Sequence, residues 1–400
     1  YPFDPFSATM ANWDDAKDNV DFIKWGYSKY GIAGKNLYIS SYSIIGDWSI
    51  NLNKITHKDG RSIHATLYME DDDGIKWFGT SEGYLLKGWR HSYRLELITI
   101  GLPFDHVTTA YHDKEGNWWF ADSHFKRTGR LSAFEDFFQT NTTPFITKWH
   151  EKDNQWTYYT PEESILIENT DVNAILRVGS TVYFGTMFGL LYLDLYNQNW
   201  NLISTTKGLS DAAVWDIIEH DGSIYVATAR GINEISIINH SLIPDKDKRF
   251  EPLSRSSIYD IEADSEFIYL ATDSGLLKIN WQDGYLNMLS NKEFRKIKLA
   301  DSSISGTDGS LWLIKDGMEE KHITSNINDF DICGSYIWSS KGSRAALLDT
   351  ATDREWAYDQ ADGIPGNQIY GTNCDENWVL FLTNSGIAFY NWEQYHYEKD

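Results

Sequence analysis

Several side chains in this sequence could carry chemistry, and the first candidates are an adjacent acid and base. Asp105 and His106 are consecutive in a predicted loop, where they could act as a general acid–base pair. The same two residues are also explained by an aspartate that caps the loop beside an exposed histidine. We favour this simpler interpretation.

Paired carboxylates are the second candidate, since two of them about 5–10 Å apart can hydrolyse glycosidic bonds. The chain has 58 acidic residues, so the presence of some close pair carries no information. The acidic run from Glu70 to Asp73, followed by Gly74, lacks the ligand spacing and closing glutamate of a calcium loop. It predicts a solvated turn, and the sequence gives no reason to expect a metal or a cofactor.

A lone cation among these acids, Arg230, could bind a carboxylate group of a ligand, or it could form a surface salt bridge. Trp215 could stack on a sugar ring or contact a peptide, although packing between neighbouring sheets explains it as well. The motifs of serine hydrolases, zinc peptidases, thiol oxidoreductases and phosphate-binding loops are all missing.

The elements that position these residues are set by a repeat of about 42 residues. Each copy reads aromatic, apolar, small, Thr, two variable positions and Gly. The clearest copies start at the following residues: Trp77, Tyr183, Tyr225, Tyr269 and, more loosely, Leu380. A period of this length with strand-forming content is typical of a β-propeller.

We therefore predict an all-β chain that forms a single β-propeller of four-stranded antiparallel sheets over residues 21–400, after an extension over residues 1–20. The anchors of the second strand number eight, seven of them aromatic and the last Leu380, so eight blades are expected, with seven to nine allowed. Only 26 residues separate Trp312 from Trp338, which predicts a truncated blade, and an insertion is expected at about 122–145. A late outer strand over 392–397 could help to close the ring.

In a propeller, the loops from strand four to strand one and from strand two to strand three surround one end of the axis. This geometry defines our candidate binding residues for a ligand or partner. They are Asp105, His106, Asp122, His124, Asp211, Trp215, Arg230, Asp273 and Asn367.

The two cysteines, Cys333 and Cys374, precede aromatic strands in successive repeats. Equivalent positions on neighbouring blades should be too far apart for a disulfide, which needs Cα atoms within about 7 Å. The sequence therefore predicts two buried thiols.

The net charge of −23 argues against nucleic acid and against anionic lipid as partners. No apolar run has the roughly 20 residues of a membrane helix, so membrane association is expected only through a partner. The chain begins at Tyr1 instead of Met, which favours removal of an export signal.

The repeat resembles that of the two-component-regulator propellers found in the sensor halves of bacterial hybrid histidine kinases. It is also similar to the propeller of an outer-surface component of the type IX secretion system. The segments that carry the resemblance are Asp73–Thr80, Gly116–Ala121 and Asp221–Thr228. The resemblance implies an exported, non-enzymatic recognition propeller in the periplasm or on the outer surface of a Gram-negative bacterium.

Three functions follow from these observations. The first, which we favour, is a scaffold or accessory subunit that binds a protein partner in a cell-surface complex, with a glycan as a possible ligand. The second is a carbohydrate-active hydrolase or lyase with axial acidic residues. The third is the glycan-sensing module of a split signalling system.

Overall fold

The protein is described here by a computed structural model. The residues that it describes are 21–25, 28–33, 36–39, 43–45, 48–51, 54–57, 62–63, 65–73, 75–80, 85–89, 95–98, 101–102, 106–123, 126, 146–153, 155–160, 164–167, 171–300, 303–315, 318–323, 326–375 and 377–395. The chain forms two compact units, Tyr1–Pro103 and Phe104–Asp400, and each is described by itself.

The described residues of the first unit form three antiparallel sheets. Their strands are β1 (Asp21–Trp25), β2 (Ser28–Ala33) and β3 (Asn36–Ile39); β4 (Ser43–Ile45), β5 (Trp48–Asn51), β6 (Lys54–His57) and β7 (Ser62–Ile63); and β8 (Ala65–Glu70), β9 (Ile75–Thr80), β10 (Leu85–Trp89) and β11 (Leu95–Ile98). In each sheet, strands that follow one another in the sequence are hydrogen-bonded neighbours.

In the second unit, the described strands form seven sheets, again with sequential strands as neighbours. The first four are β12 (Thr109–His112), β13 (Asn117–Ala121), β14 (Ile146–His150) and β15 (Gln155–Tyr159); β16 (Val172–Val178), β17 (Thr181–Thr186), β18 (Gly189–Asp194) and β19 (Asn199–Ile203); β20 (Val214–His220), β21 (Ser223–Thr228), β22 (Gly231–Ser236) and β23 (Leu242–Ile243); and β24 (Ile258–Ala263), β25 (Phe267–Thr272), β26 (Gly275–Asn280) and β27 (Leu286–Ser290). The last three are β28 (Lys296–Ala300), β29 (Ser303–Thr307), β30 (Leu311–Lys315) and β31 (Met318–Ile323); β32 (Asp329–Cys333), β33 (Tyr336–Lys341), β34 (Arg344–Asp349) and β35 (Arg354–Tyr358); and β36 (Ile369–Cys374), β37 (Trp378–Thr383) and β38 (Gly386–Asn391). The short helices in the described part of this unit are η1 (Ile165–Ile167), η2 (Thr205–Lys207), η3 (Glu251–Leu253), η4 (Gln360–Asp362) and α4 (Trp392–Tyr395).

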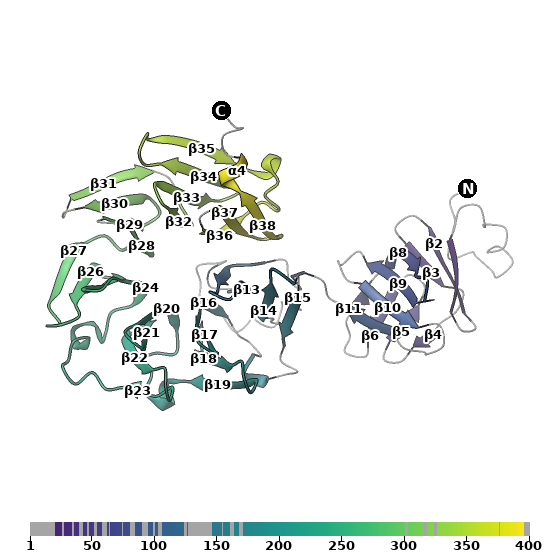
Figure 1. Ribbon diagram of the computed structural model, residues 1–400, viewed down its shortest axis with the longest axis horizontal. Helices are drawn as coiled ribbons and strands as arrows, with labels where there is room; N and C mark the ends of the chain where they lie inside the picture. The colour runs from purple at the N-terminus through teal and green to yellow at the C-terminus, as the bar shows by residue number, and fades with distance from the viewer. Residues whose placement is uncertain are drawn as a thin grey trace. The chain divides into compact units, whose positions relative to one another are not determined.

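These seven sheets surround a common axis and form a β-propeller (Figure 1). The first strand of each sheet is innermost, and it contacts the first strand of the next sheet, from β12 round to β36. The ring closes because β36 also contacts β12, and the Val107 N–H donates to the Thr383 carbonyl at 3.0 Å. Among the described residues, no sheet combines strands from the two ends of the unit.

The prediction of a propeller is confirmed. The best estimate of eight blades is wrong, because the described residues form a ring of seven (Figure 1), a number within the range of seven to nine that the sequence allowed. The anchor at Trp77 has the repeat sequence and lies on β9, in a sheet of the first unit. The repeat specifies a four-stranded sheet, whereas the number of blades depends on which sheets pack together. The boundary between an extension over 1–20 and the remaining chain falls outside the described residues and stays a prediction.

The predicted truncated blade is also wrong. Trp312 lies on β30, the third strand of its sheet, and it pairs with Gly306 on β29. This sheet has four strands, so the short spacing arose from an aromatic residue on a different strand. The late outer strand is not formed at 392–395, where the chain is helical in α4, and 396–397 lie outside the described residues.

The repeated Thr and Gly build the turn between the second and third strands. The Thr186 hydroxyl donates to the Gly189 carbonyl at 2.8 Å and accepts the Phe188 N–H at 3.0 Å. The same pair of bonds recurs in three other blades at Thr228, Thr272 and Thr383. Gly189 has a φ of 129°, a conformation that other residues rarely adopt.

The small residue of the repeat allows close packing of neighbouring blades. A Cβ added to Gly185 would lie 2.7 Å from the Cγ1 atom of Val214, on the first strand of the next blade. The hydrophobic core is divided into clusters between adjacent blades, and one of them stacks Trp119 on Tyr159 and sets it edge-on to Phe184.

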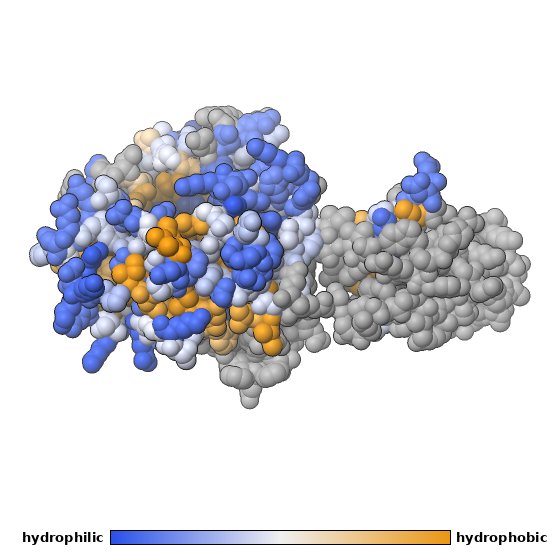
Figure 2. Space-filling model, turned by 60° about the horizontal axis from the view of Figure 1, so that its bottom comes forward, coloured by the Kyte–Doolittle hydropathy of each residue, from blue (hydrophilic) through white to orange (hydrophobic). Residues whose placement is uncertain are grey.

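Among the described residues, no helix has the length and apolar character needed to cross a membrane. Figure 2 shows a mostly hydrophilic surface on the visible face of the second unit, with a group of hydrophobic residues gathered on it.

Candidate ligand-binding face

A β-bulge is repeated at the start of the innermost strand of the blades. Asn173, Trp215, Tyr259 and Tyr370 each occupy an extra position where the ladder to the second strand shifts register. Three other blades have a residue at the equivalent position. In each of them, the backbone N–H of that residue donates to a second-strand residue, and the same second-strand residue pairs with the next residue of the first strand. The seven positions, which we call the bulge ring, are Thr108, Asn173, Trp215, Tyr259, Arg295, Asn328 and Tyr370.

The bulge ring lies at the end of the axis that the sequence predicted for binding. Backbone bonds join the turns between second and third strands to the segments that enter the first strands. The Ala229 N–H donates to the Ala213 carbonyl, and the Asp273 N–H donates to the Ser257 carbonyl, at 3.0 and 3.1 Å. We call this end of the second unit the axial face. Because bulges redirect side chains, each blade presents one variable residue there.

Neighbouring members of the bulge ring contact one another across blade boundaries. The Arg295 guanidinium lies 4.0 Å from the centre of the Tyr259 ring. His106, which precedes the first strand of the first blade, lies with its Nδ1 atom 3.0 Å from the Tyr370 hydroxyl of the last blade. Trp215, Tyr259 and Tyr370 are all half-buried, so their positions are fixed while part of each ring stays accessible.

The two asparagines of the ring have a structural role. The Asn173 side-chain amide donates to the Val214 carbonyl of the next blade at 2.9 Å, and Asn328 donates likewise to Ile369 at 3.0 Å. The ring therefore divides into polar residues that join blades and larger aromatic or cationic residues that are available for contact.

Just inside the bulge ring, charged residues alternate with buried apolar ones along the first strands of consecutive blades. Strand β24 has two acidic residues separated by one position, β28 has two lysines in the same arrangement, and β32 again has two acidic residues. The residues between them, Ile261, Ile297 and Phe330, are fully buried. We call the charged residues the axis cluster: Asp216, Asp260, Glu262, Lys296, Lys298, Asp329 and Asp331. Sequence reasoning missed this cluster, although the alternation itself is visible in the sequence.

The axis cluster ties adjacent blades together. Lys296 reaches forward to Asp329 at 2.5 Å, and Lys298 reaches back to Glu262 at 2.7 Å. Burial lowers the pKa of Lys296, but the Asp329 and Asp331 carboxylates outweigh it, so the net shift is upward. Burial together with the nearby Asp216 raises the pKa of Asp260 well above its ordinary value.

Carboxylates of the cluster also accept backbone N–H groups of the following blade. Asp216 accepts from Ile261 at 3.1 Å, and Asp260 accepts from Ile297 at 2.7 Å. These acidic groups are thus engaged in holding the inner strands together, which is a structural use of carboxylates in the region where the sequence suggested hydrolysis.

Lys126, beyond β13, shows that the cluster faces a common space. Its ammonium group interacts electrostatically with Asp329, Lys296, Asp216 and Asp260, which come from four different blades. Although the side chain retains solvent exposure, the inner strands around it desolvate it and lower its pKa.

The structure places most of the sequence-predicted residues on the axial face without gathering them at one point. The Arg230 Nε atom lies 3.5 Å from an Asp211 carboxylate oxygen, while the other Asp211 oxygen accepts the Ala213 N–H. Asp273 accepts the Ser257 N–H, and Asn367 exchanges hydrogen bonds with Asn384.

Of the remaining predicted residues, Trp215 belongs to the bulge ring, and His106 contacts that ring through Tyr370. Asp122 follows β13, and its backbone carbonyl accepts the Val172 N–H at 3.1 Å. Asp105 and His124 lie outside the described residues.

The acidic turn after β8 has a structural role. One Asp71 oxygen accepts the N–H groups of Asp73 and Ile75, and the other accepts the Trp77 indole N–H at 2.9 Å. Asp113 makes the equivalent bonds and accepts the Trp119 indole N–H at 3.0 Å.

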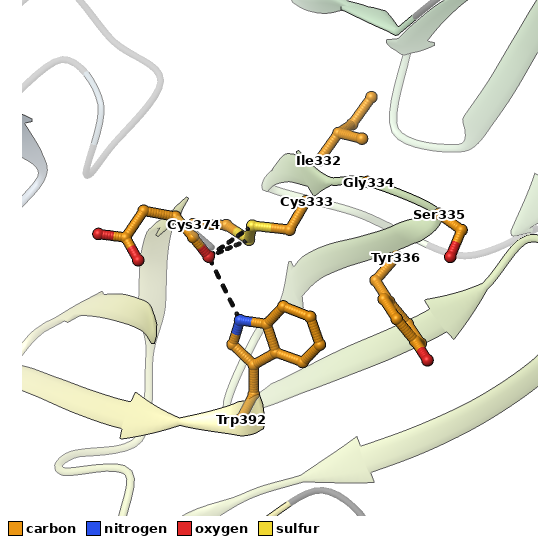
Figure 3. A pocket seen from close by; sticks show the side chains of 8 residues that line it. Ile332, Cys333, Gly334, Ser335, Tyr336, Cys374 and Trp392 are labelled. Atoms are coloured by element: carbon orange, nitrogen blue, oxygen red, sulfur yellow. Dashed lines mark hydrogen bonds between the residues drawn. A yellow bond between two sulfur atoms is a disulfide. The ribbon is translucent and has the colours of Figure 1, made fainter. Parts of the chain in front are cut away.

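The prediction of two separate thiols is wrong, because Cys333 and Cys374 form a disulfide with Cα atoms 6.1 Å apart. The innermost strands converge on the axis, so neighbouring β32 and β36 lie much closer than the outer parts of their blades. The disulfide borders a cavity of about 530 Å³ on the side away from the axial face, where the Trp392 indole N–H donates to the Asp375 carbonyl (Figure 3).

No family model and no curated protein matches this sequence. Solved structures do match. PorZ, an essential surface component of the type-IX secretion system of Porphyromonas gingivalis, gives a TM-score of 0.51 at 9% identity, over 73% of this chain and 37% of PorZ. YCF48 bound to a D1 peptide gives a TM-score of 0.52 at 12% identity, over 72% of this chain and 94% of YCF48.

The extracellular domain of BT4673 from B. thetaiotaomicron gives a TM-score of 0.43 at 15% identity, over 82% of this chain and 51% of that chain. The resemblance to the propeller of a type IX component is confirmed at the level of the fold by the match to PorZ. Identities this low establish the β-propeller and leave the function open.

Proposed function

We propose that this protein is an exported, non-catalytic binding propeller, a scaffold or accessory subunit that holds a segment of a protein partner on its axial face. The observation that carries the proposal is the bulge ring, in which Trp215, Tyr259, Arg295 and Tyr370 are presented at one end of the axis. Trp, Tyr and Arg are the residue types that contribute most to protein interfaces.

The face is rigid before any partner arrives. The aromatic rings of the bulge ring are half-buried, and several described loops of the face are bonded to their neighbours through backbone groups, as at Ala229–Ala213 and Asp273–Ser257. Binding would therefore order few side chains, which reduces its entropic cost. YCF48, which shares the propeller fold, has been solved with a peptide bound, and this supports assigning a peptide-binding role to the present chain.

Export to the periplasm or the outer surface of a Gram-negative bacterium is part of the proposal. The Cys333–Cys374 disulfide supports it, because disulfides persist mainly in oxidising compartments. The fold shared with a bacterial surface component is consistent with this placement.

Site-specific photo-crosslinking in the producing cell tests the proposal. A photoreactive phenylalanine analogue replaces Phe188, which is 55% exposed in a turn of the axial face. In the control it replaces Tyr196, which is 93% exposed in the turn between β18 and β19, at the other end of the same blade. We expect a discrete protein adduct from position 188 only. Equal adducts from both positions, or none from position 188, would refute an axial binding face.

A further inference from the structure

Three arginines occupy the axial face on three consecutive blades of a strongly acidic chain. Arg230 lies in the turn between β21 and β22, Arg255 in the segment that enters β24, and Arg295 in the bulge ring before β28. We call them the arginine sector. Because the whole chain has a net charge of −23, three arginines on neighbouring blades form a local group of cations that could recognise an anionic ligand.

The guanidinium groups of the sector are accessible and only partly neutralised. Arg230 is 73% exposed, and its contact with Asp211 is a long one at 3.5 Å through Nε alone. Arg295 is 56% exposed and pairs with Glu293 at 2.6 Å. Arg255 is exposed, and within the described part of the chain its side chain has no ion pair or hydrogen bond.

The backbone that carries these arginines is held in place. The Gly231 N–H, next to Arg230, donates to the Ser256 carbonyl, next to Arg255, at 2.8 Å. Ser257 is bonded through its N–H to the Asp273 side chain and through its carbonyl to the Asp273 N–H. The segment around Arg255 is therefore fixed between two neighbouring loops, and its position relative to Arg230 is set before binding.

Aromatic rings accompany the cations. Tyr259 lies against the Arg295 guanidinium at 4.0 Å, and Trp215 occupies the bulge position of the blade that carries Arg230. A ligand that reaches the sector thus meets planar cations, which bind carboxylates through paired hydrogen bonds, beside half-buried aromatic surfaces.

We propose that the arginine sector binds the carboxylates of an acidic peptide segment of the partner, with apolar side chains of the segment against Trp215 and Tyr259. This inference rests on the proposed function and specifies its partner. A peptide is favoured over a polyphosphate because a chain of phosphates has no apolar group to place against the half-buried rings of Trp215 and Tyr259. A peptide is also favoured over an anionic glycan. A peptide can alternate acidic side chains, which pair with the arginines, with apolar side chains, which pack against the aromatic rings.

Fluorescence anisotropy with labelled nine-residue peptides tests the inference on the full chain. The probe alternates Glu, Phe and Gly, and two matched peptides replace every Glu with Gln or Lys. A hexaglucuronate represents the anionic glycans. The protein variants are R230Q/R255Q/R295Q and, as a control for the loss of an exposed arginine far from the axial face, R354Q on the outer strand β35. Since all three sector residues are exposed, the triple variant should melt within about 3 °C of the unmodified protein.

We expect the Glu peptide to bind more tightly than the Gln peptide, and the Lys peptide to bind least. Each exposed arginine should contribute about three-fold in affinity, so the triple variant should bind the Glu peptide about thirty-fold more weakly. R354Q should bind like the unmodified protein. Binding that is unchanged in the triple variant, or no preference for Glu over Lys, would overturn the inference. Sector-dependent binding of the hexaglucuronate without binding of the Glu peptide would overturn it in favour of a glycan.

The crosslinking experiment separates this inference from the proposed function. If the adduct from position 188 persists undiminished in the triple variant, the axial face binds a partner but the arginine sector does not select it. If the adduct depends on the three arginines, both are supported. If no adduct forms with the unmodified sector, the proposed function fails, while the peptide measurements still decide what the sector binds.

Discussion

The disulfide between Cys333 and Cys374 gives the sharpest test of the fold. It joins the ends of two innermost strands, β32 and β36, and so links the last two blades. The last blade has three strands among the described residues, where the others of the ring have four. A covalent link should therefore matter most at this place in the ring.

The size of the effect follows from the length of the loop that the disulfide closes. The two cysteines are 41 residues apart in sequence, and a loop of that length lowers the entropy of the unfolded chain by about 13 cal/mol/K, or about 4 kcal/mol at 25 °C. At about 2 °C per kcal/mol for a unit of this size, reduction should lower the melting temperature by about 8 °C. Differential scanning fluorimetry with and without a reductant measures this shift.

The matched control is C333S/C374S, which should melt at the lower temperature and show no response to reductant. A thiol assay on denatured, unreduced protein should find no free thiol. Two free thiols per chain would show that the inner strands do not approach as described. A shift below about 1 °C on reduction would show that the disulfide does not constrain the unfolded chain.

Three further predictions concern the inner strands and the turns. Lys296→Met leaves the Asp329 carboxylate partly buried without its counter-ion, and we expect a loss of about 2 kcal/mol in the free energy of unfolding, measured by denaturant titration. Gly275→Ala places a Cβ against a backbone carbonyl at a φ of 133°, and it should lower the free energy of unfolding by more than about 2 kcal/mol. Gly222→Ala, at a φ of 76° with open space around it, should lower the free energy of unfolding by about 1 kcal/mol. The pKa of Asp260 is raised from 3.8 by burial, so folding favours its protonated form, and stability is lost as the pH rises through the folded-state pKa. Asp260→Asn should therefore raise the melting temperature at pH 8 and flatten its decline between pH 4 and pH 8, and an unchanged pH profile would contradict this assignment.

The turn chemistry of this fold could be predicted from the sequence because it depends on nearby residues. The repeated Thr bonds the residue two positions on and the Gly three positions on, and both contacts can be read from the spacing. The small residue before the Thr is explained by the proximity of the next blade, which any propeller imposes at that position. Local sequence therefore determined each sheet.

Contacts between sheets were harder to predict, and the errors share this cause. The sheet that contains Trp77 has the repeat but lies in the first unit, so counting repeats overestimated the blades. The separation of Cys333 and Cys374 was judged from typical blade spacing, which does not hold close to the axis. In both cases the missing information was the distance between elements about forty residues apart in sequence.

The axis cluster shows which sequence signal would have helped. A strand with one accessible face and one buried face alternates in polarity, and the residues around Ile261, Ile297 and Phe330 do so with charges of one sign on each strand. Reversal of that sign from one repeat to the next predicts that the strands are neighbours, since like charges would repel and opposite charges pair. The Lys298 contact with Glu262 on the preceding blade fits that expectation. Residue types can be compared between repeats at the bulge ring in the same way. That comparison finds the aromatic and cationic side chains on which the binding proposal rests.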